Sequence, residues 1–176
     1  MKKEKIFNVF FDTEFTDIHP LVTPSLISIG CVAQDGRELY VELLDTWAIH
    51  QCSQFVVGTV LPLLDNKEFI KEADLAVKLR DWVESLGDGE VVFRSDSPSY
   101  DWGFVADLFN FYGCWPKNMR RKCGTIYWES RRLQHRYDAG MASYWKEHSA
   151  RQHHALVDAR SMQFAWKYVI RKAVRQ

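Results

Sequence analysis

The chain is poor in the features that mark metal–thiolate, secreted and membrane proteins. Its four cysteines include no Cys-x-x-Cys pair, which excludes the common spacings of zinc and thioredoxin-type redox sites. Free thiols in a reducing compartment are the simplest interpretation. No apolar run approaches the roughly 18 residues of a membrane-spanning helix, and Asp12 ends the apolar stretch after the N-terminal lysines too early for a secretory signal. We therefore expect a cytoplasmic protein that does not cross a membrane.

The chain also lacks net charge, internal repeats and low-complexity tracts. It has 23 Lys or Arg and 23 Asp or Glu, a balance that indicates no general affinity for nucleic acid but leaves room for a local basic patch. Hydrophobic residues make up 47% of the 176 residues, which is typical of a folded chain that buries a sizeable core. We expect one domain over residues 1–176.

Hydrophobic periodicity predicts a strand-rich start followed by helices and further strands. Strands are expected at 5–12, 25–33 and 38–43, with Asp35-Gly36 as a hairpin signal between the last two. The later patterns predict, in order, a short helix from Ser53 to near Pro62, a helix at 71–86, a strand at 91–94, a helix capped by Ser99 and ending near Tyr112, a strand at 123–128, and helices at 139–148 and 155–173. We expect an α/β fold in which helices flank a mixed sheet made of a three-stranded antiparallel meander and two further strands.

Two carboxylates interrupt the first strand, in the stretch VFFDTEFT. Positions i and i+2 of a strand share a face, so Asp12 and Glu14 project together. Alone, they could be edge residues in water. Asp101, however, heads an apolar stripe of its helix, although an acid there also suits the helix dipole. Asp158 lies on or beside the apolar face of the last helix, where a surface acid is out of place.

Four acids that point inward repel one another and are costly to remove from water. Divalent cations resolve both problems, because Mg²⁺ and Mn²⁺ prefer hard oxygen ligands. Two such ions about 3.5–4 Å apart can activate a water and stabilise the leaving oxygen of a phosphodiester. The pattern therefore predicts two Mg²⁺ or Mn²⁺ ions bound by Asp12, Glu14, Asp101 and Asp158.

Three stretches, FFDTEFT, SPSYDWGF and HHALVDAR, resemble in order the three motifs of the DEDDh 3'→5' exonucleases, which have a ribonuclease H-like fold. The third motif is H-x-x-x-x-D, the spacing from His153 to Asp158. The resemblance implies that the four acids are metal ligands and that His153, rather than His154, is the general base. The second motif commonly has Asn four residues before its Asp, where this chain has Ser97.

The resemblance implies a metal-dependent 3'→5' exoribonuclease that releases nucleoside 5'-monophosphates from single-stranded RNA. The sequence of the first 45 or so residues most resembles small bacterial exoribonucleases of the ribonuclease AS type, and this resemblance favours RNA over DNA as the substrate. Three alternatives stay open: a 3'→5' exonuclease on single-stranded DNA, a phosphodiesterase for small nucleotides, and a non-catalytic nucleic-acid-binding module. Related small exonucleases are commonly homodimers, and we expect the same here.

A basic segment suits a nucleic-acid partner. Residues 115–136 hold seven Lys or Arg and one acid, interleaved with aromatic residues, a pattern that fits phosphate neutralisation and base stacking. Charge runs are also commonly no more than solvated surface, and aromatic residues beside strands are commonly core. The expected substrate contacts are Thr13, Phe15, Trp102, Arg120, Arg121, Arg131 and Arg132.

Overall fold

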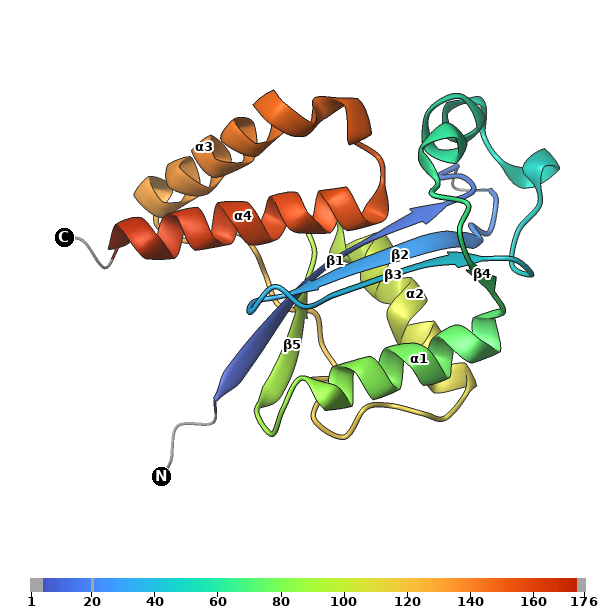
Figure 1. Cartoon of the computed structure of the whole chain (residues 1–176), viewed down its shortest axis with the longest axis horizontal. Helices are drawn as coiled ribbons and strands as arrows, with labels where there is room; N and C mark the ends of the chain where they lie inside the picture. The colour runs from blue at the N-terminus through green and yellow to red at the C-terminus, as the bar shows by residue number, and fades with distance from the viewer. Residues whose placement is uncertain (1–4, 20, 174–176) are drawn as a thin grey trace.

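The computed structural model describes residues 5–19 and 21–173, and a five-stranded mixed sheet lies at its centre (Figure 1). The strands are β1 (Ile6–Phe15), β2 (Leu26–Ala33), β3 (Glu38–Leu43), β4 (Phe69–Ile70) and β5 (Glu90–Arg94), in the spatial order β4-β3-β2-β1-β5. β1, β2 and β3 form the expected antiparallel meander, whereas β5 runs parallel to β1 and β4 runs parallel to β3. The expected α/β class and mixed sheet are therefore confirmed.

Helices cover both faces of the sheet. α1 and α2 lie on one face, and α3 and α4 lie on the other (Figure 1). The helical elements of the described residues are η1 (Ile49–Gln51), η2 (Val56–Val60), η3 (Leu61–Leu63), α1 (Glu72–Ser85), α2 (Pro98–Phe111), α3 (Arg131–His148), η4 (Ser149–Arg151) and α4 (Ala155–Ala173). None of these helices combines the length and the apolar character that a membrane crossing needs.

Side-chain alternation along β1 divides the core into two layers. Val9 and Phe11 belong to the larger hydrophobic cluster, beneath α1 and α2. Phe10 points the other way and packs in a second cluster beneath α4. A strand buried on both faces is apolar at nearly every position, because neighbouring residues face opposite sides. Asp12 and Glu14 break this rule on the α4 side, since they share the face of Phe10.

The first turn of α4 lies directly against the sheet. A Cβ at Gly30 would lie 2.2 Å from the backbone nitrogen of Leu156, so a larger residue in β2 would push the helix away. Gly30 pairs with Asp12 of β1 on one side and with Tyr40 of β3 on the other. The start of α4 is thus fixed over the row of the sheet that carries Asp12.

The predicted strand at 123–128 is wrong. Within the described residues, this segment makes one isolated bridge to β5, between Gly124 and Arg94. Beyond that bridge residues 125–128 have no regular secondary structure, and the Thr125 hydroxyl oxygen accepts the backbone N–H of Tyr127 at 3.0 Å, a local bond that competes with strand pairing. The sheet still has five strands, because the two-residue strand β4, which was not predicted, lies at the edge beside β3.

Two predicted helix starts are also wrong. α2 begins at Pro98, whose fixed φ suits the first helical position, so Ser99 lies within the first turn and does not cap the helix. α3 begins at Arg131, well before the expected range of 139–148. Its early turns are stabilised by the burial of Tyr137 in the cluster beneath α4. Arg131 is therefore a helical residue.

The remaining expectations agree closely with the structure. The helices predicted at 71–86 and 155–173 are α1 and α4. The Ser53 hydroxyl oxygen accepts the backbone N–H of Val56 at 3.2 Å, as expected of a cap, although the turns that follow are the π-helical η2 and the 3-10 turn η3. β1 continues past residue 12 to Phe15, so both of its acids lie inside the strand.

Candidate active site

Asp12 and Glu14 lie near the C-terminal end of β1, so one rigid strand positions both acids. The two residues pair with Gly30 and Ser28 of β2, and the regular register ends immediately afterwards, between Glu14 and Phe15. Such irregularities are over-represented beside active sites, where they re-aim a side chain. Because the register is regular up to Glu14, Asp12 and Glu14 share one face of β1, as predicted, and each acid joins a different group of side chains that could hold a metal ion.

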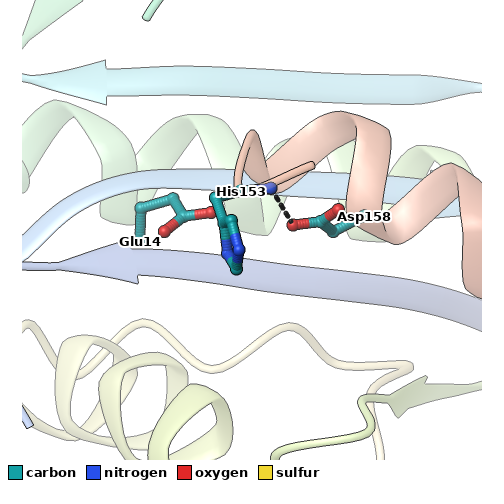
Figure 2. Close-up of side chains that lie close together, drawn as sticks. All are labelled: Glu14, His153 and Asp158. Carbon is teal, nitrogen blue, oxygen red and sulfur yellow. Dashed lines mark hydrogen bonds between the residues drawn. The ribbon is translucent and has the colours of Figure 1, made fainter. Parts of the chain in front are cut away.

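The first group consists of Glu14, His153 and Asp158, each with a ligand atom within 4.8 Å of the others. Figure 2 shows the carboxylates of Glu14 and Asp158 pointing toward His153 from opposite sides. The backbone N–H of His153 donates to Oδ2 of Asp158 at 3.0 Å, the dashed line in Figure 2. The loop before α4 is thereby tied to the first turn of that helix.

The second group consists of Asp12, Asp96 and Asp101, again within 4.8 Å of one another. Asp101 is only 1% exposed, and both of its carboxylate oxygens accept hydrogen bonds. Thr13 donates to Oδ1 from its hydroxyl at 2.5 Å and from its backbone N–H at 3.2 Å, and the Ser95 hydroxyl donates to Oδ2. These donors fix the orientation of the buried carboxylate.

Burial and the charges of neighbouring acids raise the pKa values of the acids in both groups. Burial, followed by the charges of Asp158 and Asp101, raises the pKa of Glu14 to about 8. Burial raises the pKa of Asp158 to about 7 and that of Asp101 to about 6, against the opposing effect of their hydrogen bonds. The pKa of Asp12 is raised by burial and then by the charges of Asp101 and Glu14. Positive charge placed among these groups would relieve the penalty.

The donor set fits hard divalent cations. Carboxylate oxygens are the preferred ligands of Mg²⁺ and Mn²⁺, and each group presents at least two carboxylates. Oδ1 of Asp158 is buried and has no hydrogen-bond partner among the described residues. A buried oxygen without a partner is costly, and a cation would satisfy it. The four acids expected to be metal ligands, Asp12, Glu14, Asp101 and Asp158, are brought together.

The two adjacent histidines have different surroundings. His153 is partly exposed, and its ring meets the edge of the Phe55 ring, with centroids 5.0 Å apart. His154 is 3% exposed and stacks on Tyr40. Burial, and then the charge of Arg151, lowers the pKa of His154. Only His153 lies in a ligating group with the acids.

The two aromatic residues expected to contact substrate differ in their packing. Phe15 follows Glu14 directly and stacks on Tyr100, with ring centroids 5.5 Å apart, and Tyr100 is 44% exposed. This pair forms a partly open aromatic surface at the rim of the site. Trp102 instead packs against the main core and against Trp115, with centroids 6.0 Å apart. Thr13 is buried and donates to Asp101, so its expected contact with substrate stays a prediction.

The basic residues are spread over a larger area than the acids. Arg120 forms an ion pair with Glu90, which lies beside Ile6 at the opposite end of β1 from Asp12, roughly 20 Å away at a strand's rise per residue. The Arg121 guanidinium lies over the Trp115 ring, 5.1 Å from its centroid. Arg131 and Arg132 are exposed in the first turn of α3. Arg120 therefore lies far from the acids.

Two residues at the site, Asp96 and Phe55, were missed by sequence reasoning. Asp96 lies two residues after the end of β5. Tyr127 is 60% exposed, and its hydroxyl donates to the backbone oxygen of Asp96 at 3.2 Å, so one aromatic residue of the basic segment reaches the acids. Phe55 is 54% exposed beside His153. The position of an acid two residues after a strand was the available signal for Asp96, the aromatic residues within the basic segment indicated Tyr127, and no sequence pattern indicated Phe55.

The chain matches no protein-family model, and the search of curated proteins found no matching protein.

Proposed function

We propose that the chain is a metal-dependent 3'→5' exonuclease with a ribonuclease H-like fold. Its substrate is single-stranded RNA, from whose 3' end it releases nucleoside 5'-monophosphates. The observation that carries the proposal is the convergence of five carboxylates and His153, from strand, loop and helix, in two ligating groups at one end of β1. The order of the three exonuclease-like motifs along the chain supports the same reaction class.

Each residue has a role that follows from its position. Asp12, Glu14, Asp101 and Asp158 would hold two Mg²⁺ or Mn²⁺ ions, which supply Lewis-acid stabilisation of charge on the phosphodiester. Thr13 and Ser95 orient the Asp101 carboxylate through their hydroxyl groups. His153 is partly exposed, and its imidazole would accept the proton of the attacking water as general base.

The surroundings of the acids suit a single strand. The stacked rings of Phe15 and Tyr100 border Glu14 and offer a face on which a terminal base can stack. Tyr127 offers a second exposed ring beside Asp96. Exposed Arg131 and Arg132 would neutralise backbone phosphates farther along the strand. The same surfaces would serve single-stranded DNA, which is the alternative substrate.

One experiment separates the candidate functions. Single-stranded RNA and DNA of equal sequence, each labelled at the 5' end, are incubated with the protein in Mg²⁺, in Mn²⁺ or in EDTA. We expect ladders that shorten from the 3' end on RNA, and none in EDTA. A stronger ladder on DNA would favour the alternative nuclease. Binding without any ladder would favour the non-catalytic module, and cleavage of dinucleotides alone would favour a small-nucleotide phosphodiesterase.

The expected homodimer stays a prediction. A monomeric mass in light scattering at micromolar concentration would contradict it.

A further inference from the structure

His153 has a backbone conformation that a histidine rarely adopts. Its φ is +71°, in the left-handed region, which costs free energy in a residue other than glycine unless the surroundings fix it. The hydrogen bond from its N–H to Asp158 accounts for one restraint. The edge of the Phe55 ring against the His153 ring is another. The chain that leads from His153 into α4 begins with His154, whose contacts add a further restraint.

His154 is anchored by its ring and not by its nitrogens. The ring stacks on Tyr40 with centroids 4.4 Å apart and planes 26° apart. Neither ring nitrogen has a hydrogen-bond partner among the described residues, and Nε2 approaches Oδ1 of Asp65 only to 3.5 Å, too far for good geometry. The His154 carbonyl oxygen accepts the backbone N–H groups of Val157 at 2.8 Å and Asp158 at 3.0 Å. The stacked residue therefore also starts α4.

Tyr40 is itself held firmly in β3. Its hydroxyl donates to Oε1 of Glu42 at 2.8 Å. Glu42 is 2% exposed and accepts the backbone N–H of Asp65 at 2.6 Å and that of Asn66 at 3.0 Å. Because Tyr40 pairs with Gly30, which pairs with Asp12, the stack stands on the same row of the sheet as a candidate metal ligand.

We propose that Tyr40 and His154 form a positioning pair, which sets His153 relative to the acids of β1 through ring stacking. This inference rests on the proposed function, since the role of His153 in catalysis does. His154 touches neither substrate nor ion in this proposal. It holds the loop in which His153 adopts its left-handed conformation, and its ring shape rather than its proton chemistry carries the effect.

Replacements that keep or remove the ring test the proposal. His154→Phe preserves stacking, and we expect it to keep kcat within about twofold on 5'-labelled RNA, since large losses come from misplacement of the catalytic group. His154→Ala and Tyr40→Leu remove the stack, and we expect kcat to fall by about 10- to 100-fold, the effect of a misplacement of about 1 Å. KM should change little, because the substrate surface is untouched.

A second measurement does not depend on activity. Hydrogen exchange of the His153 backbone amide reports its bond to Asp158, and we expect faster exchange in His154→Ala and native-like exchange in His154→Phe. The matched control is His148→Ala, which removes another stacked histidine–tyrosine pair, with centroids 4.1 Å apart, from α3. That variant should leave both kcat and the exchange of the His153 amide unchanged.

Two results would overturn the positioning role. The first is a folded His154→Phe variant as impaired in kcat as His154→Ala, because the ring nitrogens would then matter. The second is unchanged kcat and unchanged exchange in both His154→Ala and Tyr40→Leu. If the wild-type protein cleaves no nucleic acid, the proposed function fails, and the exchange measurement alone then decides whether the pair holds the His153 loop.

Discussion

The hydroxyl of Thr13 donates to Oδ1 of Asp101 at 2.5 Å and joins β1 to α2 across 88 positions of the chain. Both residues are almost fully buried. The bond places a carboxylate of α2 beside the acids of β1, although Thr13 itself points to the opposite face of the strand from Asp12. Thr13, which lies between the candidate ligands Asp12 and Glu14 in β1, thus aligns a third candidate ligand, Asp101.

Thr13→Val should impair the site without removing a ligand. Valine has nearly the same volume but no hydroxyl, so a buried carboxylate loses a donor, at a cost of about 1–3 kcal/mol in the free energy of unfolding. The pKa of Asp101 should rise further, because the Thr13 hydroxyl lowers it. We expect weaker Mn²⁺ binding by calorimetry and slower RNA hydrolysis. Thr13→Ser keeps the hydroxyl and is the control; equal losses in both variants would contradict the assigned role.

Asp12→Asn should abolish hydrolysis and leave the fold intact. The substitution removes a charged ligand but little volume, and it relieves repulsion from Asp101 and Glu14. The thermal midpoint of the metal-free protein should therefore be unchanged or higher, while turnover on labelled RNA disappears. Full activity in this variant, or full activity of the wild type in EDTA, would refute the metal-dependent reaction.

Asp96→Asn tests the acid that sequence reasoning missed. Asp96 is exposed at the rim of the group that contains Asp12 and Asp101, so its loss should weaken the binding of a cation without eliminating it. We expect the Mn²⁺ concentration needed for half-maximal activity to rise by about 10-fold, in line with losses from outer partners of metal sites. Asp107→Asn, an exposed acid on α2, is the control. No difference between the two variants would remove Asp96 from the site.

His153→Ala should lower turnover by about 10²–10⁴-fold, the usual contribution of a general base. Substrate binding should be largely kept, because the acids and the aromatic rim remain. His154→Ala should cost less, because His154 lies outside both ligating groups. The comparison uses single-turnover hydrolysis of one labelled RNA at fixed Mg²⁺. A larger loss in His154→Ala than in His153→Ala would reverse the assignment of the base.

The raised pKa values of Glu14 and Asp158 should make the stability of the metal-free protein depend on pH. The pKa of Glu14 is raised from an ordinary 4.5 to about 8, and that of Asp158 from 3.8 to about 7, so the folded state binds protons more tightly than the unfolded chain. The contribution of these two groups to the free energy of unfolding is therefore greatest below the pKa values that they have in the unfolded chain. It is lost as the pH rises toward the pKa values that they have in the folded protein.

In EDTA, the thermal midpoint should thus decrease as the pH rises from 3.8, the ordinary pKa of Asp158, to about 8, the pKa of Glu14 in the folded protein. Glu14→Gln removes one titrating group and should flatten this fall. Mg²⁺ or Mn²⁺ should raise the midpoint more at the upper end of the range, where the carboxylates are ionised and the repulsion is greatest. A fall of equal steepness in Glu14→Gln would show that other groups dominate.

Local pattern was sufficient for much of the fold. The meander, α1 and α4 follow from periodicities of two and 3.6 residues, and the position of Asp12 and Glu14 on one face follows from the strand period alone. The segment at 123–128 is not a strand: the backbone N–H of Tyr127 donates to the Thr125 hydroxyl, and such local bonds compete with strand pairing in ways that composition does not reveal.

Residue pattern alone places acids in core-forming segments at the end of β1 and at the starts of α2 and α4. Their division into two groups, with His153 and Asp158 beside Glu14 and with Asp96 and Asp101 beside Asp12, depends on the folded structure. So do the different surroundings of His153 and His154, of which the motif spacing selected only the first. These neighbours could not be read from the sequence because they are set by the close approach of α4 to Gly30 and by bonds across β1, contacts between residues far apart along the chain.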